Sequence, residues 1–200
     1  MRPILVLLLS GLVSHTFGQD FRKYYSVVAD VNKPLSNKAF IGNTSTRGAK
    51  FVYREFISDK FAVGGELGFA TYHDYVPPTQ YGNNPTLYTD IYSYVYNYTL
   101  TLSGEYYFVT NSWIMPYAGL GIGLSYSKID AYFNIFQDEE KKWGALLRPN
   151  IGTLMRFGNK SRWGASIGIH LDYATIKSEN FDYKNFTNVG LQGGLFVMLR

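Results

Sequence analysis

The side chains most suggestive of chemistry are Ser166, His170 and Asp172, which share one face of an alternating segment. Serine, histidine and aspartate serve hydrolases and acyltransferases, in which a nucleophile needs a base within hydrogen-bond reach. Four residues of extended chain at ~3.3 Å each would hold Ser166 and His170 about 13 Å apart. A catalytic site would need a partner from another segment, so a hydrogen-bonded polar network inside the fold is the favoured interpretation.

The segment that carries these residues is one of eight that alternate apolar and polar residues with a period of two, which is typical of β-strands. Several exceed the roughly five or six residues of a soluble strand and match the ~9–11 that cross a membrane. The sequence therefore predicts an all-β fold, an eight-stranded antiparallel up-and-down transmembrane β-barrel. The predicted strands cover approximately Tyr24–Val31, Ala49–Ile57, Phe61–Tyr72, Tyr92–Phe108, Ile114–Lys128, Gly144–Phe157, Trp163–Thr175 and Asn188–Leu199.

Short and long connections alternate between these segments. The short ones are Ser58–Lys60, Val109–Ser112 and Gly158–Arg162, and the long ones are about Asn32–Gly48, His73–Ile91, Ile129–Trp143 and Lys177–Thr187. Such alternation gathers short turns at one rim and long loops at the other, as in bacterial outer-membrane barrels with periplasmic turns and extracellular loops. Both termini are then expected at the periplasmic rim. Pro77-Pro78 indicate a loop, although some tyrosines nearby could instead continue the strands above the membrane.

The two faces of the predicted strands differ in side-chain size. In Ile114–Lys128, large apolar residues such as Leu120 and Ile122 oppose glycines and serines such as Gly121 and Ser125. A soluble barrel would place its large apolar side chains inside, whereas a membrane barrel turns them outward and keeps a narrow lumen. A soluble ligand-binding barrel is therefore disfavoured.

Several charged residues fall on the face predicted to line the lumen. Because a buried charge must be paired, carboxylates and guanidinium groups on this face predict a salt-bridged plug instead of a wide pore. Arg54 and Glu55 point to opposite faces, so only one of them can be lumenal, and the pattern leaves the facing of this strand open; the predicted network includes Arg54. The predicted lumenal network comprises Arg54, Glu66, Glu105, Arg148, Arg156, His170 and Asp172.

Aromatic residues cluster near both ends of the predicted strands, where a membrane barrel carries girdles at the lipid headgroups. The short-turn girdle is predicted to contain Phe61, Phe108, Trp113, Phe157 and Trp163. The loop-side girdle is predicted to contain Tyr72, Tyr92, Tyr94, Tyr126, Trp143 and Tyr173.

The composition and the N-terminal segment further limit the classes of protein and of functional site that the chain could represent. Cysteine is absent, which removes disulfides, thiolate metal sites and a lipoprotein anchor, and we predict no cofactor, metal or catalytic residue. The net charge of +4 is dispersed, which does not predict nucleic-acid binding. Arg2 precedes a short apolar run, Pro3–Val13, and Gly18 is the small residue after which cleavage is expected. Residues 1–18 are therefore predicted to be a signal peptide, and residues 19–200 the barrel domain.

These segments resemble the outer-membrane protein β-barrel-domain family, especially its Bacteroidetes-type members. The resemblance is carried by Ser45–Gly48, Phe61–Gly65 and Pro116–Leu124, the last being similar to the family's Pro-Tyr-x-Gly-x-Gly-x-Gly strand. It implies an outer-membrane location and eight strands, and it supplies no catalytic residues. One departure is that an aromatic residue often ends such barrels, whereas Phe196 here stands four positions before the end.

The favoured functional hypothesis is a non-enzymatic, monomeric integral outer-membrane protein of a Gram-negative bacterium, with a role in envelope structure or surface interaction through its long loops. Expected partners are outer-membrane lipids, lipopolysaccharide and the outer-membrane assembly machinery. The alternatives are a lipid-modifying or hydrolytic barrel enzyme that uses His170 and Asp172, and a narrow pore.

Overall fold

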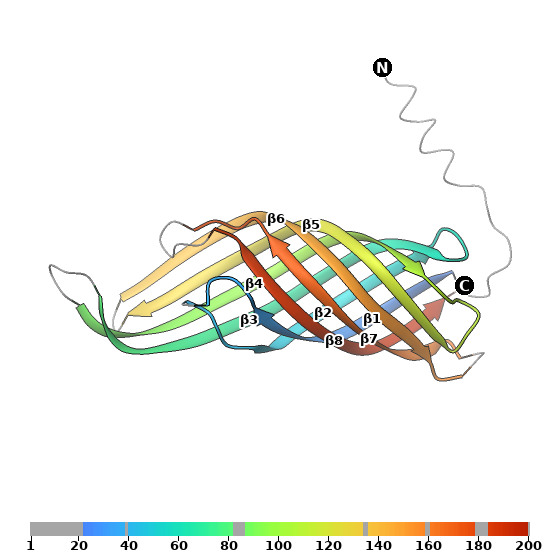
Figure 1. Ribbon diagram of the computed structural model, residues 1–200, viewed down its shortest axis with the longest axis horizontal. Coiled ribbons are helices and arrows are strands. Elements are labelled where there is room, and N and C mark those ends of the chain that lie inside the picture. Colours follow the sequence, from blue (N-terminus) through green and yellow to red (C-terminus); the bar gives the residue numbers. More distant parts are fainter. Residues whose placement is uncertain are drawn as a thin grey trace, which may run out of the picture.

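The chain forms a closed antiparallel barrel of eight strands in sequence order (Figure 1). The computed structural model describes residues 22–38, 40–81, 87–133, 136–158, 161–178 and 184–199, so the predicted signal peptide lies outside it. The strands are β1 (Lys23–Pro34), β2 (Ser45–Phe56), β3 (Phe61–Tyr81), β4 (Leu87–Tyr107), β5 (Ile114–Phe133), β6 (Phe136–Arg156), β7 (Trp163–Ala174) and β8 (Phe186–Leu199).

Closure gives every strand two hydrogen-bonded neighbours, because β1 pairs with both β2 and β8. The alternation of the sequence becomes the two sides of the wall. On β4, Leu100 and Leu102 are 52% and 69% exposed, whereas Thr101 between them is fully buried. The predicted fold class is therefore confirmed. The expectation that small side chains fill the lumen is wrong at its two ends, where large side chains such as Tyr72 and Phe196 are buried. Within the described residues, no helix is long and apolar enough to cross a membrane.

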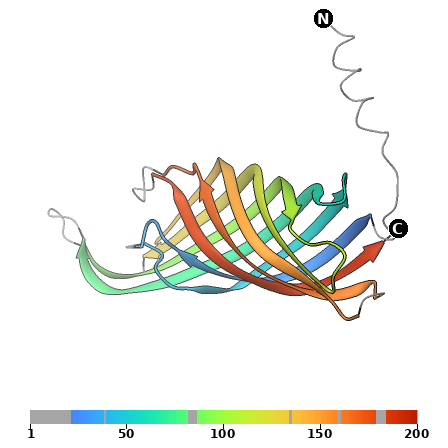
Figure 2. The ribbon, with the colours of Figure 1, turned by 45° about the vertical axis from the view of Figure 1, so that its right-hand side comes forward.

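Strands β3 to β6 are much longer than predicted and project beyond the rest of the barrel (Figures 1 and 2). They have 20 or 21 residues, against 12 to 14 in the other four. The predicted loops His73–Ile91 and Ile129–Trp143 are thus wrong, because most of their described residues are strand. The ladder shifts register between Val76 and Thr79, and this irregularity accommodates Pro77-Pro78.

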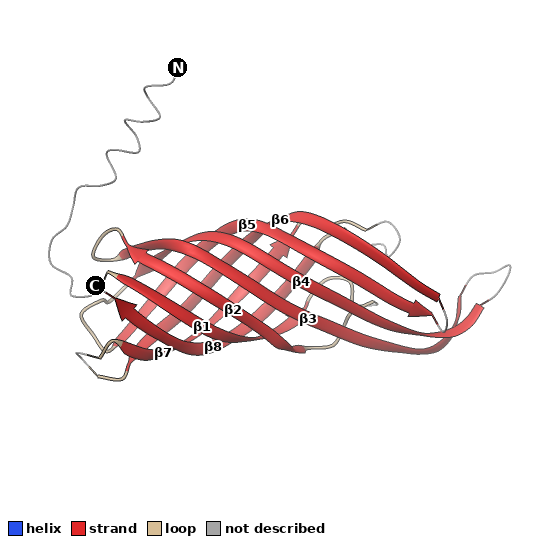
Figure 3. Cartoon of the chain, turned by 180° about the vertical axis from the view of Figure 1, so that it is seen from behind, coloured by secondary structure: helices blue, strands red, loops and turns tan. Residues whose placement is uncertain are grey.

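The described residues of the connections that follow β1 and β7 lie at the same rim, where hydrogen bonds join the two connections (Figure 3). The backbone N–H of Leu35 donates to the carbonyl of Thr187 at 2.8 Å. The amide of Asn37 donates to the carbonyl of Asn185 at 2.6 Å. The first loop also contacts the projecting sheet, where Asp74 accepts a 2.7 Å hydrogen bond from the backbone N–H of Gly42.

Two apolar clusters occupy the two ends of the barrel interior. The cluster at the short-turn end includes Tyr24, Leu154 and Phe196. The cluster at the loop end includes Ile129 and Tyr72. Burying these side chains stabilises the barrel by roughly 1.5–3 kcal/mol each, and it leaves a polar layer between two apolar ends.

Candidate functional site

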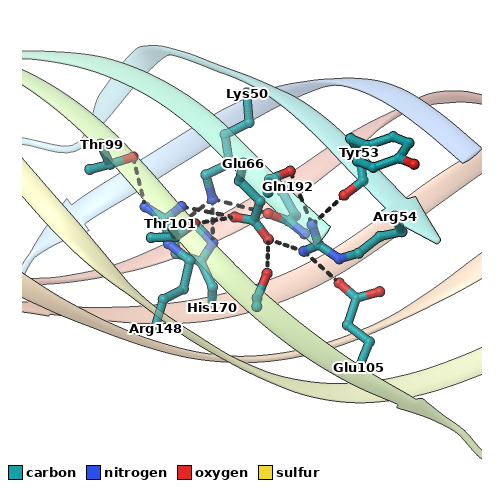
Figure 4. Close-up of polar contacts among 12 residues, drawn as sticks. Lys50, Tyr53, Arg54, Glu66, Thr99, Thr101, Glu105, Arg148, His170 and Gln192 are labelled. Atoms are coloured by element: carbon teal, nitrogen blue, oxygen red, sulfur yellow. Dashed lines mark hydrogen bonds and ion pairs between the residues drawn. The ribbon is translucent and has the colours of Figure 1, made fainter. Parts of the chain in front are cut away.

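The polar layer between the apolar clusters is an ionic network built from six strands. Figure 4 shows its centre, where Arg54 and Arg148 approach Glu66. The described cations of the network are Lys50 and Arg54 on β2 and Arg148 on β6. Its described anions are Asp30 on β1, Glu66 on β3, Glu105 on β4 and Asp172 on β7. All seven side chains are buried.

Arg148 is the centre of this network. Its Nε and Nη2 donate to the two carboxylate oxygens of Asp172 at 2.6 and 2.7 Å, which is the bidentate geometry that a guanidinium group favours. Its Nη1 donates to Glu66 Oε2 at 2.9 Å, and its Nη2 also contacts Thr99 Oγ1 at 3.2 Å. One side chain therefore joins β3, β4, β6 and β7 across the lumen.

Arg54 extends the network toward the short-turn end. Its Nη2 pairs with Glu66, and the same atom lies 2.8 Å from Glu105 Oε1. Glu105 Oε2 accepts hydrogen bonds from the hydroxyls of Tyr24 at 2.9 Å and Tyr107 at 2.7 Å. These tyrosines belong to the apolar cluster at that end, so their hydroxyl groups connect the ionic layer to it.

Lys50 forms the other end of the layer. Its ammonium lies 3.0 Å from Asp30 Oδ2 and donates to Gln192 Oε1 at 3.0 Å. It is also 3.1 Å from both ring nitrogens of His170. The ring of His170 is pressed against Gly190, where an added Cβ would collide with it. Contacts with Lys50 and with Gly190 therefore hold the ring of His170 in place.

The lumen around these charges is almost filled. A cavity of only about 10 Å³ lies beside Asp30, Tyr72 and Arg148, which is room for about one water molecule. The network holds three cations and four carboxylates, a formal balance of −1 with His170 neutral. Within the described residues, paired charges between two apolar clusters oppose a continuous column of water, so this geometry disfavours the narrow-pore alternative.

The same enclosure argues against catalysis in the lumen. The side chain of His170 has no exposed surface, and its closest charged neighbour, Lys50, is also buried. A substrate needs a concave site much larger than the small cavity nearby. In the described part of the chain, no group of three or more His, Asp or Glu side chains could hold a metal ion. The contacts of these residues join strands to one another inside the barrel.

Six of the seven residues predicted for the lumenal network lie in this layer. Arg156 does not, because it is half-buried at the short-turn end of β6. Sequence reasoning missed Lys50 and Asp30. Lys50 stands four positions from Arg54 and so shares its face, a signal that the uncertainty about β2 concealed. Glu55 faces outward, where its carboxylate lies 3.6 Å from the ammonium of Lys23.

The predicted girdle residues divide into three groups. Most are on the outer surface near the rims, with Trp163 58% exposed at the short turns and Trp143 68% exposed at the loop side. Tyr72 is a correction, because it is 1% exposed and packs inside against Phe186. Tyr94 and Tyr92 face outward but lie on the projecting part of β4, four and six residues beyond Tyr98.

The barrel is similar to solved structures of small outer-membrane proteins. Neisserial surface protein A matches at 17% identity and a TM-score of 0.56, over 88% of this chain and 97% of that one. OprG from Pseudomonas aeruginosa matches at 16% and 0.51, over 92% and 98%. The chain therefore has the fold of eight-stranded outer-membrane barrels.

The barrel also has a weak similarity to a barrel protease. The outer membrane protease OmpT from Escherichia coli matches at 7% identity and a TM-score of 0.45, over 94% of this chain and all of that one, which is too low to carry an argument about activity. No family model and no curated protein sequence matches the chain.

Proposed function

We propose that the chain is a non-enzymatic integral protein of a Gram-negative outer membrane that acts through the surface it projects outside the membrane. The observation that carries this proposal is the filled lumen, in which Arg148 joins four strands between two apolar clusters. Among the described residues the lumen is packed with paired charges and apolar clusters, so the outer wall, the projecting sheet and the loops are the surfaces that we propose for function.

The outer wall supports the membrane location. Outward-facing residues from Phe61 to Phe69 cover about 20 Å along the barrel axis, at ~3.3 Å per residue and a tilt near 40°, close to the ~25 Å apolar band of such barrels. The apolar band includes Leu67, Leu102 and Ile122, all more than half exposed. Water would oppose this much exposed apolar surface.

The proposal also covers the orientation of the barrel, its oligomeric state and its partners. We place both termini and the short turns in the periplasm, and the projecting sheet outside the cell. We also propose that the protein is monomeric and that it contacts outer-membrane lipids and lipopolysaccharide. The outer-membrane assembly machinery is proposed to insert it. Within the outer-membrane protein β-barrel-domain family, we propose that it belongs with the Bacteroidetes-type members. The proposed role is envelope structure or surface contact.

Location is tested by separating inner and outer membranes and running the protein on a denaturing gel with and without boiling. The proposal expects an outer-membrane band that migrates faster before boiling. A soluble periplasmic protein without a mobility shift would contradict it.

Orientation is tested with single cysteines, because the natural chain has none. On intact cells, a membrane-impermeant maleimide should label Lys38→Cys in the first long loop and leave Ser58→Cys in a short turn unlabelled. Both positions are exposed, so they differ only in the rim they occupy. The reverse labelling pattern would overturn the orientation.

A further inference from the structure

The outer face of β3 to β6 changes character at a row of aromatic rings. Phe69, Tyr98, Tyr126 and Trp143 form this row, with successive ring centroids 5.1, 6.1 and 4.8 Å apart. Outward-facing residues nearer the short turns are mostly aliphatic, and beside the row they border an apolar hollow of about 690 Å³. The row therefore marks the expected edge of the hydrocarbon layer.

Beyond the row, the same face carries aromatic rings instead of aliphatic side chains. We call the six rings the aromatic face: His73, Tyr75, Tyr92, Tyr94, Tyr96 and Tyr132. Tyr94 is central, with its ring stacked 6.4 Å from both His73 and Tyr96 and edge-on to Tyr132 at 5.9 Å. Tyr75 and Tyr92 pair at 4.8 Å and remain 46% and 47% exposed.

Charged residues border the aromatic face and neutralise one another. The ammonium of Lys128 lies 3.0 Å from Asp130, 2.9 Å from Glu139 and 6.0 Å from the centre of the Tyr96 ring. The ammonium of Lys141 lies 2.6 Å from Glu139. These two cations and two anions balance, and Asp90 beside Tyr75 adds a further negative charge. The border therefore has no excess positive charge to attract a phosphate or a polyanion, but it provides donors and acceptors side by side.

The position of the aromatic face limits what can reach it. Tyr92 lies six residues beyond Tyr98 on β4, about 20 Å along the strand and about 15 Å along the barrel axis. The headgroup layer of a bilayer is only ~5–8 Å thick on each side. An ordinary phospholipid beside the barrel would leave most of this face uncovered, whereas a lipid with sugars on its headgroup would extend along it.

We propose that the aromatic face binds the sugar headgroup of glycolipids in the surrounding outer leaflet. Ring faces attract the weakly positive C–H groups of a saccharide, and tyrosine supplies rigid contact area at low entropic cost. The paired charges beside the rings exchange hydrogen bonds with sugar hydroxyls. The aromatic face continues the lipid-facing wall of the barrel and is directed away from the barrel axis, as that wall is. A neighbouring lipid therefore reaches it before a soluble ligand does. This inference rests on the proposed outer-membrane location and orientation.

The test compares two lipids on the folded full chain in detergent. Native mass spectrometry measures the apparent Kd for lipopolysaccharide with core sugars and for its lipid A stripped of them. Both lipids share the disaccharide of lipid A and differ in the core sugars that extend beyond it. The wild-type protein should bind the form with core sugars about tenfold more tightly, and Tyr75→Ala/Tyr92→Ala should lose that difference. Tyr98→Ala is the matched control, because Tyr98 is on the same face of β4 and 48% exposed but lies in the aromatic row.

Equal affinity of the wild-type protein for both lipids would overturn the proposal. An equal loss of the affinity difference in the double variant and in Tyr98→Ala would overturn it as well. Crosslinked dimers that disappear in the double variant would instead assign the face to contact between copies. An unchanged heat-dependent gel shift shows that each variant folds. Absence of the protein from the outer-membrane fraction would refute the proposed location. That result is distinct from a loss of sugar binding by a protein that is in the outer membrane.

Discussion

Replacement of Arg148 by methionine tests whether the lumen is a dry, paired ionic layer. Arg148 is 2% exposed and holds Asp172 through a bidentate pair and Glu66 through a 2.9 Å contact. Methionine approximates the stem of arginine but carries no charge, so the variant removes the charge with little change in packing volume. Both carboxylates lose a buried partner, and the formal balance of the layer moves from −1 to −2.

The magnitude follows from the burial of the partners. Breaking a buried ion pair costs about 3–5 kcal/mol, because the remaining charge is left uncompensated. An ion pair in a water-filled lumen would be worth only about 0–1 kcal/mol. The two descriptions of the lumen therefore differ by at least about 2 kcal/mol. Asp172→Leu alone should cost a similar amount, but Arg148→Met/Asp172→Leu should recover at least about 2 kcal/mol of the summed losses.

The assay is urea unfolding of the protein in lipid vesicles, followed by tryptophan fluorescence, with the free energy taken from midpoint and slope. Leu102→Ala, on the exposed outer wall, controls for a general weakening of the barrel in the membrane. If Arg148→Met loses less than about 1 kcal/mol, or if the double variant shows simple additivity, the lumen is hydrated and the reasoning fails.

Two further predictions concern the surface outside the membrane. Asp74→Ala removes the 2.7 Å hydrogen bonds from Gly42 and Asn43, so limited proteolysis should cut the first loop faster with the urea midpoint unchanged, whereas equal cleavage rates would contradict the contact. Hydrogen bonds from Lys141 and Lys128 hold the pKa of Glu139 below its ordinary value. Its pairing therefore contributes to stability above the unfolded pKa and is lost as pH falls through the lowered pKa. Carboxyl NMR should show Glu139 titrating low and Lys141→Ala raising its pKa, and an unmoved titration would refute the pairing.

The period-two alternation predicted the wall of the barrel well, because strand faces follow directly from sequence position. Thr101 is buried between Leu100 and Leu102 as the pattern requires. Prediction failed where residue type was given more weight than position. Tyr72 has the same parity as the inward-facing Ala70, yet its ring suggested a girdle. A tyrosine can fill the lumen here because Phe186 provides an apolar partner.

The projecting hairpins could not be derived from local signals. Pro77-Pro78 normally interrupt a strand, and only the pairing of β3 with β4 on both sides of them carries the ladder past. The ionic layer was only partly predictable for a related reason. Position identifies which charges face inward, but which cation meets which carboxylate depends on strand stagger, as in the contact of Lys50 on β2 with Asp30 on β1.

The filled lumen is the central claim, and planar-bilayer conductance of the purified, folded protein tests it most directly. We expect insertion without reproducible conductance steps above the lipid baseline, because paired charges and two apolar clusters leave space for about one water molecule. Steady steps of uniform size, altered in Arg148→Met, would show a continuous water path through the ionic layer and contradict the account.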